Sequence, residues 1–222
     1  PSSDDNTAVQ WAVANGLATT LALLLNDPRV APADLRIKAA AQYGHANVMA
    51  VLLADPRLDP AVDNSAAIVC AANYGYADVV SLLLADPRLD PTAGNNAALC
   101  RAVRHGHAPV VALLLADPRI DPSANNNSAI RTAACHRHPA ATALLLADPR
   151  VDPPAKLIAS FYLSAHADDA TTIASFLALP SFDPAYADND ALAWAAQSGL
   201  PNAVALLLAD PRSSLPPDHC SR

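Results

Sequence analysis

The sequence is poor in aromatic and charged residues, which make up 5% and 16% of its 222 positions. Only two lysines occur, Lys38 and Lys156, and the net charge is −7. No basic stripe is present that could displace counterions from a phosphate backbone, so we exclude a nucleic-acid partner. No apolar run reaches the roughly 18 residues of a membrane-spanning helix, which excludes a membrane span. Because 52% of the residues are hydrophobic, the composition is the reverse of that of disordered chains.

The four cysteines are also uninformative about chemistry or compartment. Cys70, Cys100, Cys135 and Cys220 form no CxxC pair and no framework spacing. The chain begins at Pro1 without a methionine, which predicts a processed chain or a fragment in which any leader is missing. The single glycosylation sequon begins at Asn126 and matters only if the chain enters a secretory pathway.

The dominant feature of the sequence is an internal repeat. The tripeptide Asp-Pro-Arg recurs at intervals of 28, 31, 31, 31 and 62 residues, and the longest interval has a degenerate copy, Leu179-Pro180-Ser181, at its midpoint. The chain is therefore predicted to contain seven copies of a unit of about 31 residues. The six intact tripeptides begin at Asp27, Asp55, Asp86, Asp117, Asp148 and Asp210.

Two aligned columns predict where helices begin and end. Five of the six glycines share one column, which predicts left-handed residues just past a helix. The full column reads Gly16, Gly44, Gly75, Gly106, Arg137, Asp168 and Gly199. About ten residues earlier stands a column of expected N-caps, whose side chains would accept bonds from free helical N–H groups. It reads Asn6, Asp34, Ser65, Asn96, Asn127, Ile158 and Asn189.

Each unit is predicted to form two helices and a loop. A short alanine-rich helix precedes the glycine, with apolar positions such as Leu99, Ala102 and Val103. A leucine-rich helix follows, for example residues 110–115, and Asp117-Pro118 ends it because proline cannot continue a helix. One such unit cannot bury its apolar face alone, so stacked units must share a core.

These motifs resemble the ankyrin repeat. The family's Gly-His, Val-Val and Leu-Leu-Leu pattern stands here as Gly106-His107, Val110-Val111 and 113–115, and again as Gly75-Tyr76, Val79-Val80 and 82–84. The Ala-Ala pair of its first helix occurs at Ala40-Ala41, Ala71-Ala72, Ala133-Ala134 and Ala195-Ala196. The resemblance covers residues 6–212. It departs from the family in the missing Thr-Pro-Leu-His opening and in the Asp-Pro-Arg-x-Asp-Pro link, which predicts a shorter, proline-stiffened finger.

The resemblance implies an all-α, ankyrin-like solenoid. Residues 1–212 would form seven helix-turn-helix repeats with projecting loops, of which the sixth, residues 153–183, is degenerate. Residues 213–222 would form a C-terminal tail. Family resemblance favours a cytoplasmic location, while the missing methionine and the sequon at Asn126 leave an extracellular location open.

The resemblance also implies a non-catalytic scaffold that binds another protein through a concave face. That face would include the two columns just before the turn glycine, where polar and aromatic side chains gather. Tyrosine, histidine and arginine are residue types that anchor interfaces. The alternative is a solvated ridge that binds nothing in particular. The expected contact residues are Asn15, Gln42, Tyr43, Asn73, Tyr74, Arg104, His105, His136, His166 and Gln197.

Metal and catalytic sites are weaker interpretations of the same residues. A zinc site built from Cys135, His136 and His138, or from His105, His107 and His166, would need ligands that converge at about 2.0–2.3 Å from one ion. Equivalent residues of adjacent repeats are expected about 10 Å apart instead. A Cys-His nucleophile would need an orienting group and a pocket, and Asp168-Asp169 falls in a turn. We therefore expect no enzyme, no cofactor and no metal.

The terminal repeats suggest a second function. Solenoids that end in water normally carry polar capping repeats, whereas the second helices of repeats one and seven are as apolar as the interior ones. Leu21, Leu24, Val204 and Leu207 would then allow head-to-tail stacking of copies into a filament. The motif arginines and aspartates would form a ladder of charges that pair between repeats, each exposed pair contributing about 0–1 kcal/mol.

Overall fold

The computed structural model describes residues 4–27, 30 and 35–213, so the predicted tail beyond Ser213 and the expected cap Asp34 lie outside the described residues. The chain divides into two compact units, residues 1–121 and 122–222, which we call the first and second unit. The described residues form fourteen helices and no strand, which confirms the all-α prediction. No described helix is long and apolar enough to cross a bilayer.

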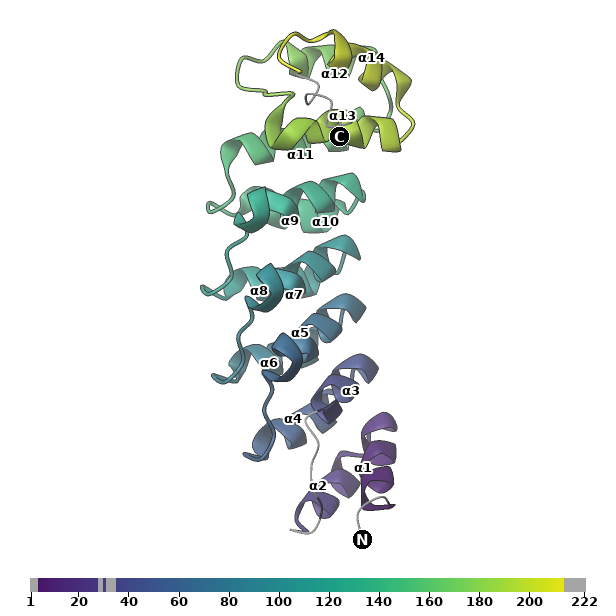
Figure 1. Ribbon diagram of the computed structural model, residues 1–222, viewed down its shortest axis with the longest axis vertical. Coiled ribbons are helices and arrows are strands. Elements are labelled where there is room, and N and C mark those ends of the chain that lie inside the picture. The colour runs from purple at the N-terminus through teal and green to yellow at the C-terminus, as the bar shows by residue number, and fades with distance from the viewer. Residues whose placement is uncertain (1–3, 28–29, 31–34, 214–222) are drawn as a thin grey trace, which may run out of the picture. The chain divides into compact units, whose positions relative to one another are not determined.

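The helices come in pairs, one pair for each predicted repeat. Figure 1 shows the pairs α3–α4, α5–α6 and α7–α8 of the first unit following one another in the same orientation. The first unit contains α1 (Asp4–Ala14), α2 (Ala18–Leu25), α3 (Leu35–Tyr43), α4 (Ala46–Ala54), α5 (Val62–Tyr74), α6 (Ala77–Ala85), α7 (Ala93–Arg104) and α8 (Ala108–Ala116). The second unit contains α9 (Ala124–Cys135), α10 (Pro139–Ala147), α11 (Pro153–Ala165), α12 (Ala170–Leu177), α13 (Tyr186–Gln197) and α14 (Pro201–Ala209).

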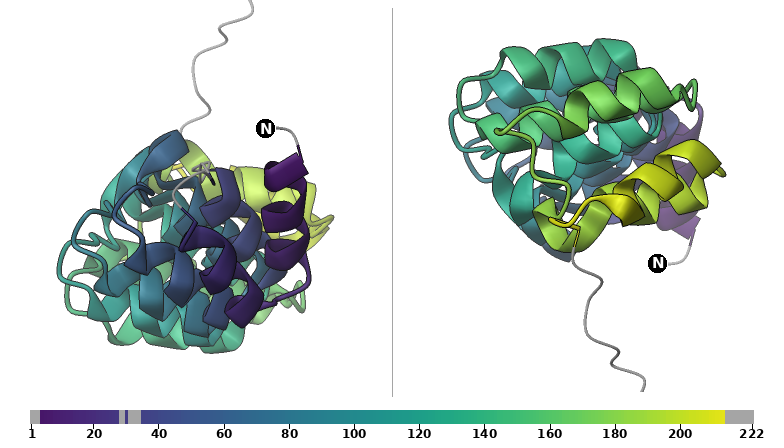
Figure 2. Two further views of the ribbon diagram at one scale, coloured as in Figure 1. Left: turned by 90° about the horizontal axis from the view of Figure 1, so that it is seen from below. Right: turned by 90° about the horizontal axis from the view of Figure 1, so that it is seen from above.

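Two layers of helices build the first unit. Its first helices, α1, α3, α5 and α7, pack against one another, and its second helices, α2, α4, α6 and α8, do the same. This arrangement can be followed in the end-on views of Figure 2. Ala102 and Val103 of α7 and Val110, Val111 and Leu114 of α8 are completely buried. Because alanine adds little bulk, the first helices pack close together, while the second helices bury larger valine and leucine side chains.

The turn column after the first helix adopts the predicted left-handed backbone. Its five glycines have φ between +67° and +80°, and the non-glycine members Arg137 and Asp168 have φ of +60° and +52°. Next to Gly44 and Gly75 the space is also filled, since a Cβ atom there would lie 2.6 Å from the ring of Tyr76 or His107 in the next repeat. Glycine is needed at these two positions for both reasons.

The expected N-cap column has a different role, so this prediction was wrong. Asn96 and Asn127 each end a run of three residues with positive φ, after which the right-handed helix begins. The buried Oδ1 of Asn96 has no hydrogen-bond partner, and Asn127 bonds sideways to Asp152 and Tyr186 of later repeats. Asparagine suits the column because its short polar side chain tolerates the left-handed region.

The Asp-Pro-Arg motif forms a turn that links consecutive repeats. Proline is favoured at the second position of a turn, and the N–H of Leu89 bonds to the carbonyl of Asp86 at 3.2 Å. The Arg88 guanidinium pairs with Asp86 at 2.6 Å and donates to the carbonyls of Leu53 and Leu58 in the preceding repeat, both at 2.9 Å. The short ion pairs of the motif arginines form within one repeat, as Arg88 does with Asp86, while Asp59 of the preceding repeat acts on Arg88 through its charge. The hydrogen bonds from arginine to backbone carbonyl groups connect the motif to the preceding repeat.

The degenerate sixth repeat changes the packing of the second unit. Its first helix, α11, is an uninterrupted helix of 13 residues. All three phenylalanines of the chain gather here, with Phe161 lying 5.6 Å from Phe176 and 5.1 Å from Phe182 between ring centroids. Trp194 of α13 joins this cluster, 4.6 Å from Tyr162. An aromatic core replaces the alanine-rich packing that the other repeats use.

Candidate functional site

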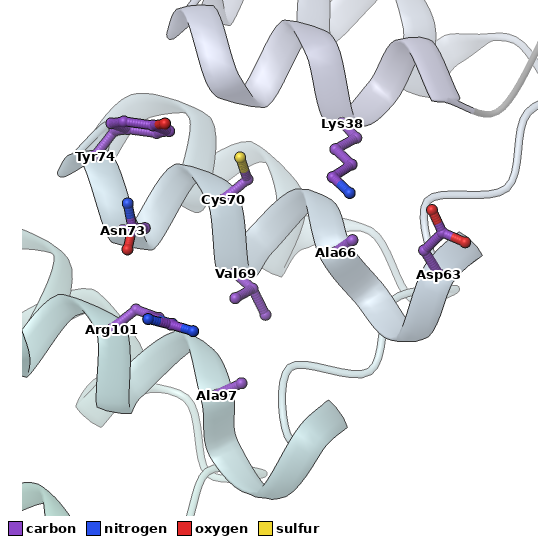
Figure 3. A pocket seen from close by; sticks show the side chains of 9 residues that line it. All are labelled: Lys38, Asp63, Ala66, Val69, Cys70, Asn73, Tyr74, Ala97 and Arg101. Carbon is purple, nitrogen blue, oxygen red and sulfur yellow. The ribbon is translucent and has the colours of Figure 1, made fainter.

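An open face runs along the first helices of the first unit. At its centre lies a pocket of about 480 Å³ that α3, α5 and α7 line together (Figure 3). The pocket positions on α5 recur every three or four residues, as expected for one side of a helix. We call this side of the first helices the groove face; in the described structure it comprises Trp11, Lys38, Tyr43, Asp63, Ala66, Val69, Cys70, Asn73, Tyr74, Ala97, Arg101, Arg104 and His105.

Most contact residues predicted in the first unit are exposed. Tyr43 and Tyr74 have exposed fractions of 49% and 48%, which is high for large aromatic side chains. Asn73 is half-buried and lines the pocket. The other four predicted residues in this unit, Asn15, Gln42, Arg104 and His105, are exposed.

The exposed rings next to the turn stack on histidine rings of the turn itself. The ring of Tyr43 lies 6.1 Å from that of His45, and the ring of His105 lies 6.0 Å from that of His107, both in stacked geometry. The turn histidines reach the preceding repeat, where His107 Nε2 lies 3.0 Å from the carbonyl oxygen of Asn73. Rings held in this way lose little conformational entropy when a partner covers them.

The structure adds groove-face residues that the sequence prediction missed. Trp11 is the most exposed aromatic residue described, at 62%. It stands five residues before its turn glycine, as do Cys70 and Arg101, and Lys38 stands six before its own. The signal was present in the sequence, because positions three and four residues before a chosen column lie on the same side of a helix.

The equivalent face of the second unit is partly covered by α13. Asp190 of α13 pairs with Arg131 of α9 at 2.6 Å and accepts a hydrogen bond from the Tyr162 hydroxyl at 2.7 Å. The ring of His166 is half-buried and lies 5.2 Å from Trp194, edge to face. His136 and Gln197 are exposed and line a smaller pocket of about 230 Å³ between α9 and α13. Of the three predicted residues in the second unit, His166 is therefore less accessible than His136 and Gln197.

The thiols near these surfaces are poor nucleophiles. Burial raises the pKa of Cys135 to about 12 and raises the pKa of Cys70, although Lys38 acts in the opposite direction on Cys70. A reactive cysteine needs a lowered pKa, because the thiolate is the attacking species. Burial, followed by the charge and the hydrogen bond of Asp190, raises the pKa of Tyr162. Within the described residues, no three His, Cys, Asp or Glu side chains converge as a metal site would require.

The residues predicted for self-assembly lie deeper than expected. Leu21 and Leu207 are completely buried, and Leu24 and Val204 are half-buried. The exposed leucines of the first and last repeats are Leu23, at 74%, and Leu208, at 50%.

Comparison with known proteins places the repeats in a family. The family model "Ankyrin repeats (3 copies)" matches residues 37–126 and 70–156, together more than half of the chain. An ankyrin repeat family protein from Legionella pneumophila is similar in structure, with 20% sequence identity, a TM-score of 0.42, and coverage of 94% of this chain and 70% of that one. No curated protein sequence matches the chain. The helix pairs, the left-handed turn column and the matched family model agree, and the chain belongs to the ankyrin-repeat family, whose repeats generally mediate protein–protein interactions and are typically non-catalytic.

Proposed function

We propose that the protein is a non-catalytic scaffold that binds another protein through the groove face of its first unit. The observation that carries this proposal is the exposure of Trp11, Tyr43 and Tyr74, three large aromatic side chains on the alanine-rich first helices. Tryptophan, tyrosine and arginine dominate the binding energy of measured interfaces. Burying such rings in water-excluding contact is favourable, and the folded chain leaves them uncovered.

The groove face also offers the polar groups that fix a partner's register. Asn73 can donate to and accept from a peptide backbone, and its own carbonyl is bonded to His107 Nε2, which holds this end of α5 in place. The predicted residues His136, His166 and Gln197 belong to the second unit, where α13 covers part of the face. We therefore place the main contact in the first unit.

A selection from a phage-displayed library of random peptides tests this proposal. Peptides selected on the intact chain should bind the Tyr43→Ala/Tyr74→Ala variant at least tenfold more weakly, the loss expected when about 1.4 kcal/mol of contact is removed. Ser81 of α6 and Ala112 of α8 are exposed on the second helices. The Ser81→Gln/Ala112→Gln variant is therefore the matched control and should bind normally. Selected peptides that bind the tyrosine variant as tightly as the wild type would contradict the proposal.

Self-assembly through the terminal repeats is a second candidate function. The exposure of Leu23 and Leu208 favours it, because the equivalent leucines of inner repeats, such as Leu82 and Leu115, are half-buried. In this candidate a second copy would cover them. Light scattering over a wide concentration range should then show growth that Leu23→Asp/Leu208→Asp abolishes, and a constant monomer mass would exclude it.

A further inference from the structure

The basic side chains of the first unit fall into two groups with different surroundings. Arg57, Arg88 and Arg119 are each paired with the aspartate two residues earlier and bonded to carbonyl groups of the preceding repeat. The other basic side chains described in this unit all lie on first helices, and they are Lys38, Arg101 and Arg104. None of the ion pairs among the described residues includes Lys38 or Arg101.

These two cations flank the pocket of the groove face. Lys38 extends from α3 on one side of α5, and Arg101 extends from α7 on the other (Figure 3). Both side chains are exposed. Between them the pocket is lined by small and apolar groups, namely Ala66, Val69, Cys70 and Ala97, with Asn73 and Tyr74 at one end.

Few carboxylates are available to neutralise this pair. Asp63 is the one acidic residue that lines the pocket. Asp59 lines a smaller neighbouring pocket together with Lys38 and Asp63, and its carboxylate accepts from the N–H of Ala61. The lining of the main pocket carries two positive charges and one negative charge, an excess of one positive charge in a chain whose net charge is −7.

We propose that the segment bound in this pocket is an extended acidic stretch of the partner protein. Its carboxylates would meet the Lys38 ammonium and the Arg101 guanidinium, and a small apolar side chain between them would rest on Val69 and Ala97. This inference rests on the proposed function and names the class of partner for the same face. An arginine fork matches carboxylate geometry, and complementary charges give selectivity and faster association. The net negative charge of the rest of the chain repels acidic ligands elsewhere and so favours this pocket.

The experiment uses the peptides selected on the intact chain. Those that need Tyr43 and Tyr74 should be enriched in Asp and Glu over the unselected library. The Lys38→Gln/Arg101→Gln variant should bind them at least tenfold more weakly, while Ser81→Glu/Ala112→Glu, which lowers the net charge by the same amount on the second helices, should leave binding within about twofold. Affinity should also fall several-fold when ionic strength rises from about 0.01 to 0.15 M, because screening acts on exposed charges.

The outcomes separate this inference from the function it rests on. The tyrosine-dependent peptides could show no acidic enrichment and bind the Lys38→Gln/Arg101→Gln variant as tightly as the wild type. This result would overturn the proposal of an acidic segment and leave the proposal of protein binding intact. The absence of tyrosine-dependent peptides would overturn both proposals. Acidic peptides whose Asp and Glu can be changed to Asn and Gln without loss of affinity would also overturn the inference, and this arm does not depend on the folding of any variant.

Discussion

The Arg88 guanidinium donates to the carbonyl of Leu53, in the last turn of α4, while it is paired with Asp86 in its own repeat. The last carbonyl groups of a helix have no partner within the helix. Arg57, Arg119 and Arg212 make the equivalent bonds to Leu25, Leu84 and Leu177. In these four repeats the tripeptide joins the repeat to the end of the preceding second helix, which explains why it recurs with the repeat.

Replacing this arginine by lysine should weaken the link between repeats. Lysine keeps the charge but cannot reach a carboxylate and two carbonyls at once. We expect Arg88→Lys to lower the free energy of unfolding by about 1 kcal/mol, since the side chain is partly exposed and hydrogen bonds contribute modestly. Urea denaturation measures the change. Arg101→Lys on the groove face is the control and should have no effect; equal losses in both variants would contradict the role given to Arg88.

The motif aspartates should make stability dependent on pH in the acid range. The hydrogen bond from the Arg88 side chain lowers the pKa of Asp86, and the same holds for Asp55, Asp117, Asp148 and Asp210 with their own arginines. A carboxyl whose pKa is lower in the folded chain stabilises it above the unfolded pKa of about 4 and loses this contribution as pH falls through the folded pKa. The wild type should therefore exceed Asp86→Asn in stability at pH 7, and the gap should narrow below about pH 4. A gap that is unchanged by pH would refute the assignment.

The turn glycines should differ in how well they tolerate a methyl group. Gly199 has φ of +67°, and no atom lies within 4 Å of the place a Cβ atom would take, so Gly199→Ala should cost only the left-handed backbone penalty of about 1 kcal/mol. At Gly75 the added carbon would lie 2.6 Å from His107 Nδ1, and overpacking adds about 1–3 kcal/mol. We expect Gly75→Ala to shift the urea midpoint clearly further than Gly199→Ala. Equal shifts would show that the ring of His107 moves aside freely.

Arg137 occupies the same column without the advantage of glycine. Its φ of +60° is strained for a side chain with a Cβ atom, so Arg137→Gly should stabilise the chain by about 0.5–1 kcal/mol. Asp168 is the matched comparison, because its carboxylate accepts from the N–H groups of Asn202 and Ala203 at 3.1 and 2.9 Å. Asp168→Gly should therefore give no gain. Thermal unfolding of both variants measures their stability relative to the wild type. Stabilisation by Asp168→Gly would mean that the hydrogen bonds of the Asp168 carboxylate contribute little.

Asp190 should hold α13 in its position across the second unit. Asp190→Ala removes the partner of Arg131 and of the buried Tyr162 hydroxyl, and we expect a loss of about 2 kcal/mol. Tyr162→Phe removes one of these bonds alone. In a double-mutant cycle the two changes should be clearly non-additive, whereas strict additivity would show that the two side chains do not interact.

The sequence predicted what depends on local chemistry and on repetition. The left-handed backbone at Gly75 followed from its place in a glycine column, and the end of α8 at Ala116 followed from Asp117-Pro118. The exposure of Tyr43 and Tyr74 followed from the family resemblance. Each of these features repeats, so that every copy of the unit strengthens the same prediction.

The rest depends on contacts between residues far apart in the sequence. No local sequence pattern predicts that Arg88 donates a hydrogen bond to Leu53, 35 residues earlier, or that Asn127 donates one to Tyr186, 59 residues later. Trp194 of α13 packs on Phe161 and Tyr162 of repeat six, which differs from the other repeats in these bulky side chains. His166 was placed on an open face for lack of this information.

Hydrogen–deuterium exchange of the full chain, with and without a tyrosine-dependent selected peptide, tests the location of the binding surface most directly. We expect slower exchange in the first helices α3, α5 and α7 and unchanged exchange in the second helices α4, α6 and α8. Protection confined to the second helices, or to α13 and α14, would contradict binding at the groove face.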